Sequence, residues 1–524
     1  MSLTQGYPRW LATAEVPHTP ASRHPVAAEA GVTAPIGSLS TGGCVVFALG
    51  WQLAAFAMLA AQLVLVGVFG PFAIIIGLTV LVALFAYRPL AGLTVYFQVL
   101  IYQNSFLSLF LRTGIEKGAF TAVQGFAFAA ISGMALVSVW RVYRPAMRHT
   151  LVFKLTRCTI IALAVIVAYA CYGVVRSSPT SAVIYFRSDA AMLLALIVGL
   201  DVGRNWCYRT VGIIFISSFG TAALLAVVEY VAPYTYYTFF DLRGYYNFKL
   251  PVDVPEISRS VNQVIASRVM TWFNITGGGN GLSVRLYGPN IEMVSFAYVV
   301  AVVGVVAATL GQGILALAVL LFLVSAGVKG PLIMLVLAGA LFAICWVIRD
   351  WRLALAASLF LLASYVTVGI VHGMASRDFH VIGLLGGVNG FLNMPWGHGL
   401  GVGGNLSEEA LQGGLDWQTW QHTGADYALE SSVGVLLYQM GVAAAAVYVP
   451  IIMLLRRGMA QTTWQRVRRH PSAIDVLFIA IACILVNGFF QEEAYSPYAL
   501  GILTLLGGVA VSCRSGRNLV AVQA

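Results

Sequence analysis

The chain has 524 residues, of which 59% are hydrophobic and 10% are charged, and its formal net charge is +10. Soluble domains carry about 25% charged residues, so this composition excludes a soluble globular protein and indicates that lipid surrounds most of the chain. Basic loops beside a membrane account for the positive charge, and no nucleic-acid partner is predicted.

The N-terminal residues 1–42 are rich in Pro, Ala, Ser and Thr, and they lack the apolar core of a signal peptide. We expect a disordered cytoplasmic tail here, a membrane domain over residues 43–513, and a short cytoplasmic tail over residues 514–524. The seven cysteines show no CxxC spacing, so neither a disulfide framework nor a zinc site is predicted.

Apolar runs without period-two alternation recur from Gly43 to Cys513, which favours helices over an outer-membrane barrel. The predicted fold class is an all-α polytopic membrane protein with about 14 transmembrane helices (range 12–14). The expected spans are 44–68, 70–87, 90–111, 119–140, 158–175, 183–202, 210–231, 290–308, 313–327, 331–348, 353–371, 431–455, 474–490 and 497–513.

The orientation follows from the basic residues, most of which fall in one set of connections. Lys and Arg collect on the cytoplasmic side of membrane proteins. Both termini are therefore expected in the cytoplasm. An even number of spans places both termini on one side, which agrees with this expectation. Two long loops, about 232–289 and 372–430, then face outward, and their length is unusual for simple connections.

Three outward-facing stretches carry candidate functional residues. The first is residues 284–290, where Arg285 lies at the membrane surface and Pro289 suits the first turn of the following helix. The second joins Arg377 to a run with five glycines within residues 397–404, which would let the backbone approach a ligand closely. Each stretch also has a purely structural alternative. Arg285 would be an interfacial arginine that snorkels, and the glycine-rich run would be an ordinary surface loop.

The third stretch is the start of the span at 431–455. Asp426 and Glu430 are four residues apart and would share a helix face. The alternative is an acidic helix N-terminus favoured by the helix dipole. No P-loop, GxSxG, HExxH or dinucleotide fingerprint is present in the sequence. The spacing of the outward histidines matches no standard zinc site, so neither a metal nor a cofactor is predicted.

At these residues the chain resembles the O-antigen ligase and polymerase superfamily of bacterial inner-membrane enzymes. The resemblance consists of Arg285 with the following Gly-Pro-Asn, Arg377 followed by the Gly-rich run at 397–401, and Glu430 eleven positions before Gly441. It covers roughly residues 285–455, and elsewhere it depends on span layout alone. It implies an outer-face site that acts on undecaprenyl-diphosphate-linked sugars.

The resemblance also implies residue roles. Arg285 and Arg377 would bind the lipid diphosphate through paired charge-assisted hydrogen bonds. Glu430 stands where the ligases usually have a His, which favours a polymerase; it would accept the proton of the attacking hydroxyl. Asp426 and His422 are the alternatives for that role. Further candidate substrate-binding residues are Lys329, Arg268, Arg259, His380, His398, Trp396, Trp420, Tyr287 and Asn290.

The function expected from this resemblance is metal-independent, inverting polymerisation of lipid-linked oligosaccharide repeat units at the periplasmic face of the inner membrane. The partners would be the donor and acceptor glycans on undecaprenyl diphosphate, membrane lipid, and a chain-length regulator and flippase of the same pathway. Two alternatives remain. One is a ligase that transfers glycan to lipid A-core or protein, and the other is a lipid-linked glycan transporter.

Overall fold

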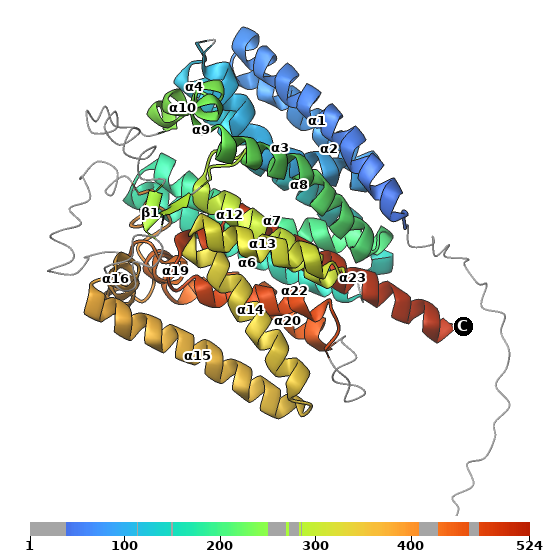
Figure 1. Cartoon of the computed structure of the whole chain (residues 1–524), viewed down its shortest axis with the longest axis vertical. Coiled ribbons are helices and arrows are strands. Elements are labelled where there is room, and N and C mark those ends of the chain that lie inside the picture. The colour runs from blue at the N-terminus through green and yellow to red at the C-terminus, as the bar shows by residue number, and fades with distance from the viewer. Residues whose placement is uncertain are drawn as a thin grey trace, which may run out of the picture. The chain divides into compact units, whose positions relative to one another are not determined.

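The computed structural model describes residues 38–112, 114–147, 150–249, 269–271, 282–284, 286–407, 428–460 and 471–523. Helices make up almost all of these residues (Figure 1). The exception is a pair of three-residue antiparallel strands, β1 (Val269–Thr271) and β2 (Leu282–Val284), in which Val269 lies opposite Val284. The composition-based prediction of a helical membrane protein is confirmed, with one short hairpin added to it.

Each of the first seven expected spans corresponds to helical structure. The elements are α1 (Thr41–Phe69), the 3-10 turn η1 (Pro71–Ala73) with α2 (Ile74–Tyr87), α3 (Pro89–Leu111), α4 (Lys117–Gln124) with α5 (Phe126–Val142), α6 (Leu151–Arg176), α7 (Pro179–Asn205) and α8 (Tyr208–Val231). A further 3-10 turn, η2 (Pro145–Met147), precedes α6.

The second half of the chain is also helical. The elements are α9 (Pro233–Phe239), α10 (Leu242–Lys249), α12 (Met293–Thr309), α13 (Gly313–Ala326), α14 (Lys329–Val347), α15 (Trp351–Ser376), α16 (Phe379–Asn393), α19 (Ser432–Met440), η3 (Gly441–Ala444), α20 (Ala445–Ala460), α22 (Asp475–Asn487), η4 (Glu492–Tyr495), η5 (Pro497–Gly501) and α23 (Ile502–Gln523).

The lengths of the helices do not confirm the expected fourteen membrane crossings. Within the described residues, eight helices are long and apolar enough to cross a membrane, or nine if the pair α4 and α5, bent by 41°, forms one span. Helices α12, α13 and α22 are shorter than the roughly 20 residues that a bilayer requires. Helix α3 is long enough, but Gln98, Gln103 and Asn104 reduce its apolar character.

The two long loops contain more structure than the sequence suggested. Helix α15 continues to Ser376, and the 15-residue helix α16 follows within the expected loop 372–430. The expected loop 232–289 contains α9 and α10. Pro289 lies before α12 rather than in its first turn, because Gly288 and Ile291 adopt positive φ angles of 61° and 56° and form a turn there.

Glycine contacts determine which helices approach most closely. Helix α7 packs along α23, where a Cβ on Gly199 would lie 2.0 Å from the carbonyl oxygen of Leu505. Helix α16 packs on α19 in the same way, since a Cβ on Gly383 would lie 1.9 Å from Leu429 O. Small residues of this kind let helix backbones meet inside a membrane.

Helices α16 and α19 run parallel. Gly383 meets Leu429 just before α19, Gly387 meets Gly434 in its first turn, and Gly390 meets Tyr438 near its end. The beginnings of both helices therefore lie side by side. Figure 1 shows α10, β1, α16 and α19 toward the same end of the long helices. This arrangement places the segments before α16 and α19 next to each other.

The C-terminal end of α7 carries a buried ion-pair cluster. Asp201, whose side chain is 1% exposed, lies 2.8 Å from an Arg141 guanidinium nitrogen and 3.3 Å from one of Arg204. Arg141 also donates to the Phe85 carbonyl at 3.1 Å. The cluster joins α2, α5 and α7, and each buried charge has a partner, which its burial requires.

Candidate functional site

Glu430 and His380 form the centre of the candidate site. Nδ1 of His380 lies 3.2 Å from the backbone oxygen of Glu430 and 3.6 Å from its carboxylate oxygen Oε2. Both side chains are half-buried. Ser431 caps α19 by accepting a hydrogen bond from Gly434 N at 3.0 Å. Glu430 therefore precedes the helix cap, and the parallel packing of α16 and α19 brings it to His380.

Arg377 occupies the corner between α15 and α16. It ends α15 in the left-handed conformation (φ 55°, ψ 46°), and Asp378 begins α16 by accepting a hydrogen bond from His380 N at 2.9 Å. Glu430 has the same φ of 55°. A left-handed conformation costs a residue other than glycine roughly 1–2 kcal/mol. Strained positions of this kind concentrate at functional sites, and two of the sequence-predicted charged residues occupy them.

The turn η4 adds two carboxylates that the sequence reasoning did not identify. The Ser432 hydroxyl donates to the backbone oxygens of Gln491 and Glu492 at 2.8 and 2.7 Å, which fixes η4 against α19. Glu492 and Glu493 both interact electrostatically with Glu430, and Glu493 also interacts with His380. The sequence signal was present, because two adjacent acids between apolar runs are unusual inside a membrane domain.

Lys249 extends the site from α10. Its ammonium group pairs with the carboxylate of Glu292, directly before α12, and lies 6.0 Å from the ring centroid of Tyr246. Burial lowers the pKa of Lys249 to about 8, and the neighbouring carboxylate of Glu493 opposes this shift. The candidate site thus contains the ammonium group of Lys249 from α10 and the imidazole of His380 from α16, among carboxylates that precede α12 and α19 or belong to η4.

A buried glutamate holds the turn over residues 286–291. Glu229, at the end of α8, accepts hydrogen bonds from Tyr287 N at 2.9 Å and Gly288 N at 2.8 Å. Tyr236 also donates to the Gly288 oxygen at 2.8 Å, and Asn104 donates to the Asn290 oxygen at 2.7 Å. The sequence reasoning missed Glu229, although it is the single acid in an apolar run, at the end of its helix that the sequence predicts to face outward.

Two of the sequence-predicted binding residues belong to this turn. Tyr287 and Asn290 are each 1% exposed. The Asn290 side chain satisfies both of its polar atoms when its nitrogen donates to Tyr287 O at 3.0 Å. The structure thus places both side chains within the turn that precedes α12. The neighbouring Arg285 lies outside the described residues.

The glycine-rich run approaches protein backbone where the sequence suggested a ligand. A Cβ on Gly397 would lie 2.5 Å from Gln439 O, and one on Gly401 would lie 2.5 Å from Ala182 N. A Cβ on Gly404 would lie 2.0 Å from the Tyr185 hydroxyl. This hydroxyl donates to Glu492 at 2.8 Å. The run therefore fits between α7 and α19 and connects them to η4.

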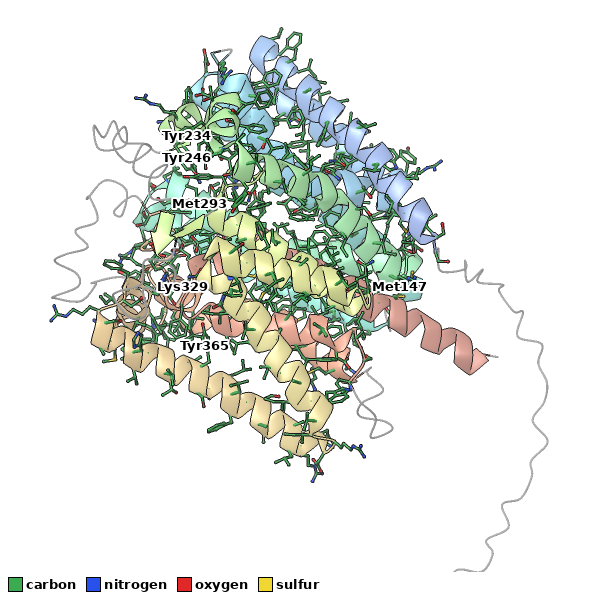
Figure 2. All side chains as sticks on the ribbon, in the orientation of Figure 1. Met147, Tyr234, Tyr246, Met293, Lys329 and Tyr365 are labelled. Carbon is green, nitrogen blue, oxygen red and sulfur yellow. The ribbon has the colours of Figure 1, made fainter. Side chains whose placement is uncertain are left out.

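The other described candidates lie around this cluster. His398 stacks on Tyr438 with ring centroids 4.0 Å apart, and its Nδ1 lies 2.9 Å from Tyr438 O. Trp396 is 71% exposed. Lys329 is exposed at the start of α14, and the next residue, Gly330, accepts a hydrogen bond from Asn487 at 3.1 Å. Figure 2 shows Lys329 and Tyr246 toward one end of the long helices and Met147 toward the other.

Several predicted site residues have no described position. Arg259, Arg268, Trp420, His422 and Asp426, like Arg285, lie outside the described residues. Within the part of the chain that the structure describes, no three His, Cys, Asp or Glu side chains gather as a metal site. The described cluster combines cations that can bind an anion with a carboxylate that can accept a proton. No protein-family model, curated protein or solved structure matches this chain.

Proposed function

We propose that this chain polymerises undecaprenyl-diphosphate-linked oligosaccharide repeat units into exopolysaccharide or O-antigen at the periplasmic face of the bacterial inner membrane. The observation that carries the proposal is the meeting of the α15–α16 corner with the segment before α19. That meeting brings His380 to Glu430 at the ends of membrane helices, and Arg377 occupies the same corner three residues before His380. The resemblance to the ligase and polymerase superfamily supports the same residues.

The chemistry requires a proton acceptor and a stabiliser of the departing diphosphate. The Arg377 guanidinium, with that of Arg285, would bind the negative charge that builds on the diphosphate oxygens. Glu430 would accept the proton of the acceptor hydroxyl as that hydroxyl attacks the anomeric carbon from the opposite face, which inverts the carbon. His380, within 3.6 Å of the Glu430 carboxylate, would orient it.

Two residues remain alternatives to Glu430 as the proton acceptor. Asp426 precedes it by four residues and His422 by eight. The proposed setting includes donor and acceptor glycans on the lipid diphosphate, a flippase that supplies them and a chain-length regulator. Both termini would lie in the cytoplasm.

The first experiment removes the protein from its host and sizes the accumulated lipid-linked glycans by mass spectrometry. Polymerase function predicts single repeat units on the outward-facing lipid. Long lipid-linked chains would show instead a ligase that transfers finished glycan to lipid A-core or protein. Single repeats confined to the cytoplasmic leaflet would show a transporter.

The second experiment tests Arg377 with a variant suited to its backbone. Arg377→Gly removes the guanidinium, and glycine adopts a φ of 55° without the steric cost. We expect a folded protein in the membrane without polymer. Arg377→Lys keeps the charge but loses the planar fork, so it should retain only part of the activity. Normal polymer from Arg377→Gly would refute the proposed role.

A further inference from the structure

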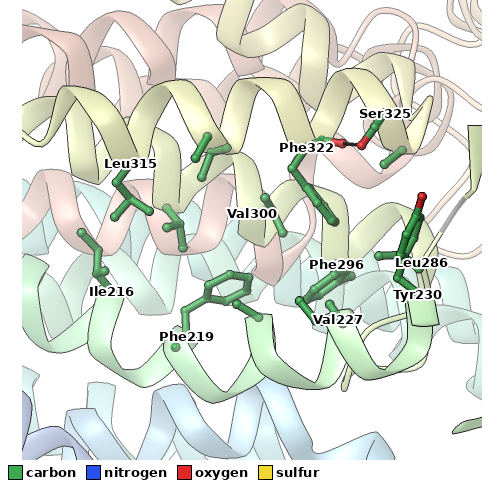
Figure 3. A pocket seen from close by; sticks show the side chains of 17 residues that line it. Ile216, Phe219, Val227, Tyr230, Leu286, Phe296, Val300, Leu315, Phe322 and Ser325 are labelled. Carbon is green, nitrogen blue, oxygen red and sulfur yellow. Dashed lines mark hydrogen bonds between the residues drawn. The ribbon is translucent and has the colours of Figure 1, made fainter. Parts of the chain in front are cut away.

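An apolar groove runs between α8 and α13, with α12 as its floor (Figure 3). Its volume is about 450 Å³. The floor residues Phe296, Val300 and Val303 are at most 4% exposed. The rims are open, since Val227 on α8 is 57% exposed and Ala318 on α13 is also exposed. A groove of this composition can accept a hydrocarbon chain along its length.

The groove has one polar end. Figure 3 shows Tyr230, Leu286 and Ser325 together at that end, and Ile216 and Leu315 at the other. The fourteen residue steps from Ile216 to Tyr230 on α8 correspond to about 21 Å at 1.5 Å per residue. Half of the hydrocarbon core of a bilayer is about 15 Å thick. The groove is therefore longer than one leaflet is deep, and a chain that enters from one leaflet would extend past the middle of the bilayer.

Cationic residues adjoin the polar end in the sequence. Leu286, which lines the groove, directly follows Arg285, and Ser325 precedes Lys329 by four residues. Glu229 fixes the turn that begins with Leu286 by accepting the Tyr287 and Gly288 amides. An amphiphile with a long apolar chain and an anionic head matches an apolar groove whose polar end is followed, four residues along the chain, by the exposed Lys329.

We infer that the groove between α8 and α13 binds the part of the isoprenoid chain nearest the diphosphate, with the headgroup at the Tyr230 end. The identity of the lipid rests on the proposed function, whereas the location of its chain rests on the groove. The lipid would then enter sideways from the bilayer between α8 and α13. Its diphosphate would lie beside the turn at residues 286–291.

Two substitutions fill the groove from opposite rims. A Cβ added to Gly220 of α8 meets no atom within 4 Å, so Gly220→Phe projects a ring into the groove without displacing the helix. Ala318→Phe does the same from α13. The matched control is Gly50→Phe in α1, an exposed mid-helix glycine where an added Cβ also meets no atom within 4 Å.

The measurement uses the full chain in phosphatidylethanolamine nanodiscs and undecaprenyl diphosphate without glycan as the probe. Native mass spectrometry and titration give the bound stoichiometry and affinity. We expect one probe molecule per chain, with affinity about tenfold weaker in Gly220→Phe and Ala318→Phe. This corresponds to lost burial of roughly two methylene groups. Gly50→Phe should bind like the unmodified protein.

Equal affinity in the filled and unmodified proteins would overturn the inference. It would also be overturned if excess phosphatidylethanolamine displaced the probe in proportion to its concentration, since the groove would then hold ordinary lipid. Groove-dependent binding in a protein that makes no polymer would refute the proposed function and leave the lipid site in place. Polymer formation unaffected by Gly220→Phe and Ala318→Phe, together with unchanged probe binding, would leave the function and remove the site.

Discussion

Arg377 and Glu430 carry charged side chains on backbone that glycine would adopt at lower cost. Both have a φ of 55°, and each directly precedes the cap residue of a helix, Asp378 before α16 and Ser431 before α19. Sequence reasoning selected both residues by charge and resemblance. It selected His380 only as a candidate substrate-binding residue and could not predict its contact with Glu430, because that contact depends on the parallel packing of two helices.

Glu430→Gln tests proton acceptance with little change of shape. The backbone oxygen that contacts His380 remains, so the thermal unfolding temperature should stay within about 2 °C of the unmodified protein. The polymerisation rate with purified lipid-linked repeat units should fall about a hundredfold or more. Glu116→Gln, at an exposed position before α4, serves as the control outside the site. A Glu430→Gln protein with the normal rate would move the role to Asp426 or His422.

Lys249 should react with amine reagents at an unusually low pH. Because burial lowers its pKa to about 8, about half of its amine is neutral at pH 8, against well under about 1% for a lysine of pKa near 10.4. Pulsed acetylation between pH 6 and 10, read by peptide mass spectrometry, should give a midpoint near pH 8. Exposed Lys117 is the internal control. The same pH dependence for both lysines would contradict this prediction.

At the scale of elements, glycines explain why the packing of the run at 397–404 and the presence of helix α16 could not be predicted from the sequence. The run at 397–404 has the composition of a flexible loop, but Gly401 and Gly404 pack against Ala182 and Tyr185 of α7. Composition cannot distinguish a ligand from protein backbone as the neighbour, because that neighbour is more than two hundred residues away. Helix α16 escaped prediction for a related reason: with 15 residues and four glycines, it is too short and too rich in glycine to suggest a span.

Gly404→Ala should disturb the site through α7. Gly404 has a φ of 91°, and its new Cβ would lie 2.0 Å from the Tyr185 hydroxyl, which donates to Glu492. We expect a loss of about 1–3 kcal/mol in the free energy of unfolding and reduced polymer. Gly339→Ala, where an added Cβ meets nothing within 4 Å, should be neutral or slightly stabilising. Thermal unfolding in detergent compares the two, and equal stability would refute the packing argument.

At the scale of the molecule, the distribution of apolar runs correctly located fourteen helical segments but overestimated how many are long enough to cross a bilayer. Helices α12 and α22 are apolar but have only 17 and 13 residues. Their apolar residues are largely buried within the protein. A buried short helix and a membrane span have the same composition, so hydropathy alone could not separate them. Glu229 and Glu492 were not predicted as site residues, because their hydrogen-bond partners come from distant segments of the chain.

The proposed orientation predicts opposite labelling at the two ends of α15. Arg349→Cys and Ser376→Cys place thiols at exposed positions before and after this helix. The exposed native Cys171 would first be replaced by Ser. In intact cells, a membrane-impermeant maleimide should label position 376 from outside, and position 349 only after lysis. Leu39→Cys should behave like position 349. Labelling in the reverse pattern would invert the proposed topology.

The packing of the glycine-rich run at residues 397–404 also has a consequence for the order of folding. Gln439 of α19 donates a hydrogen bond to Gly403 within the run, and Tyr169 of α6 donates one to Trp396 just before it. The backbone amides of Leu406 and Asn405, just after the run, donate to Tyr185 of α7 and Glu492 of η4. Contacts between such distant segments form late, because closing long loops is entropically unfavourable. The charged cluster is therefore completed only after the last helices have been inserted. Under the proposed function, a chain still leaving the ribosome would contain Arg377 without the surroundings in which it binds a lipid diphosphate.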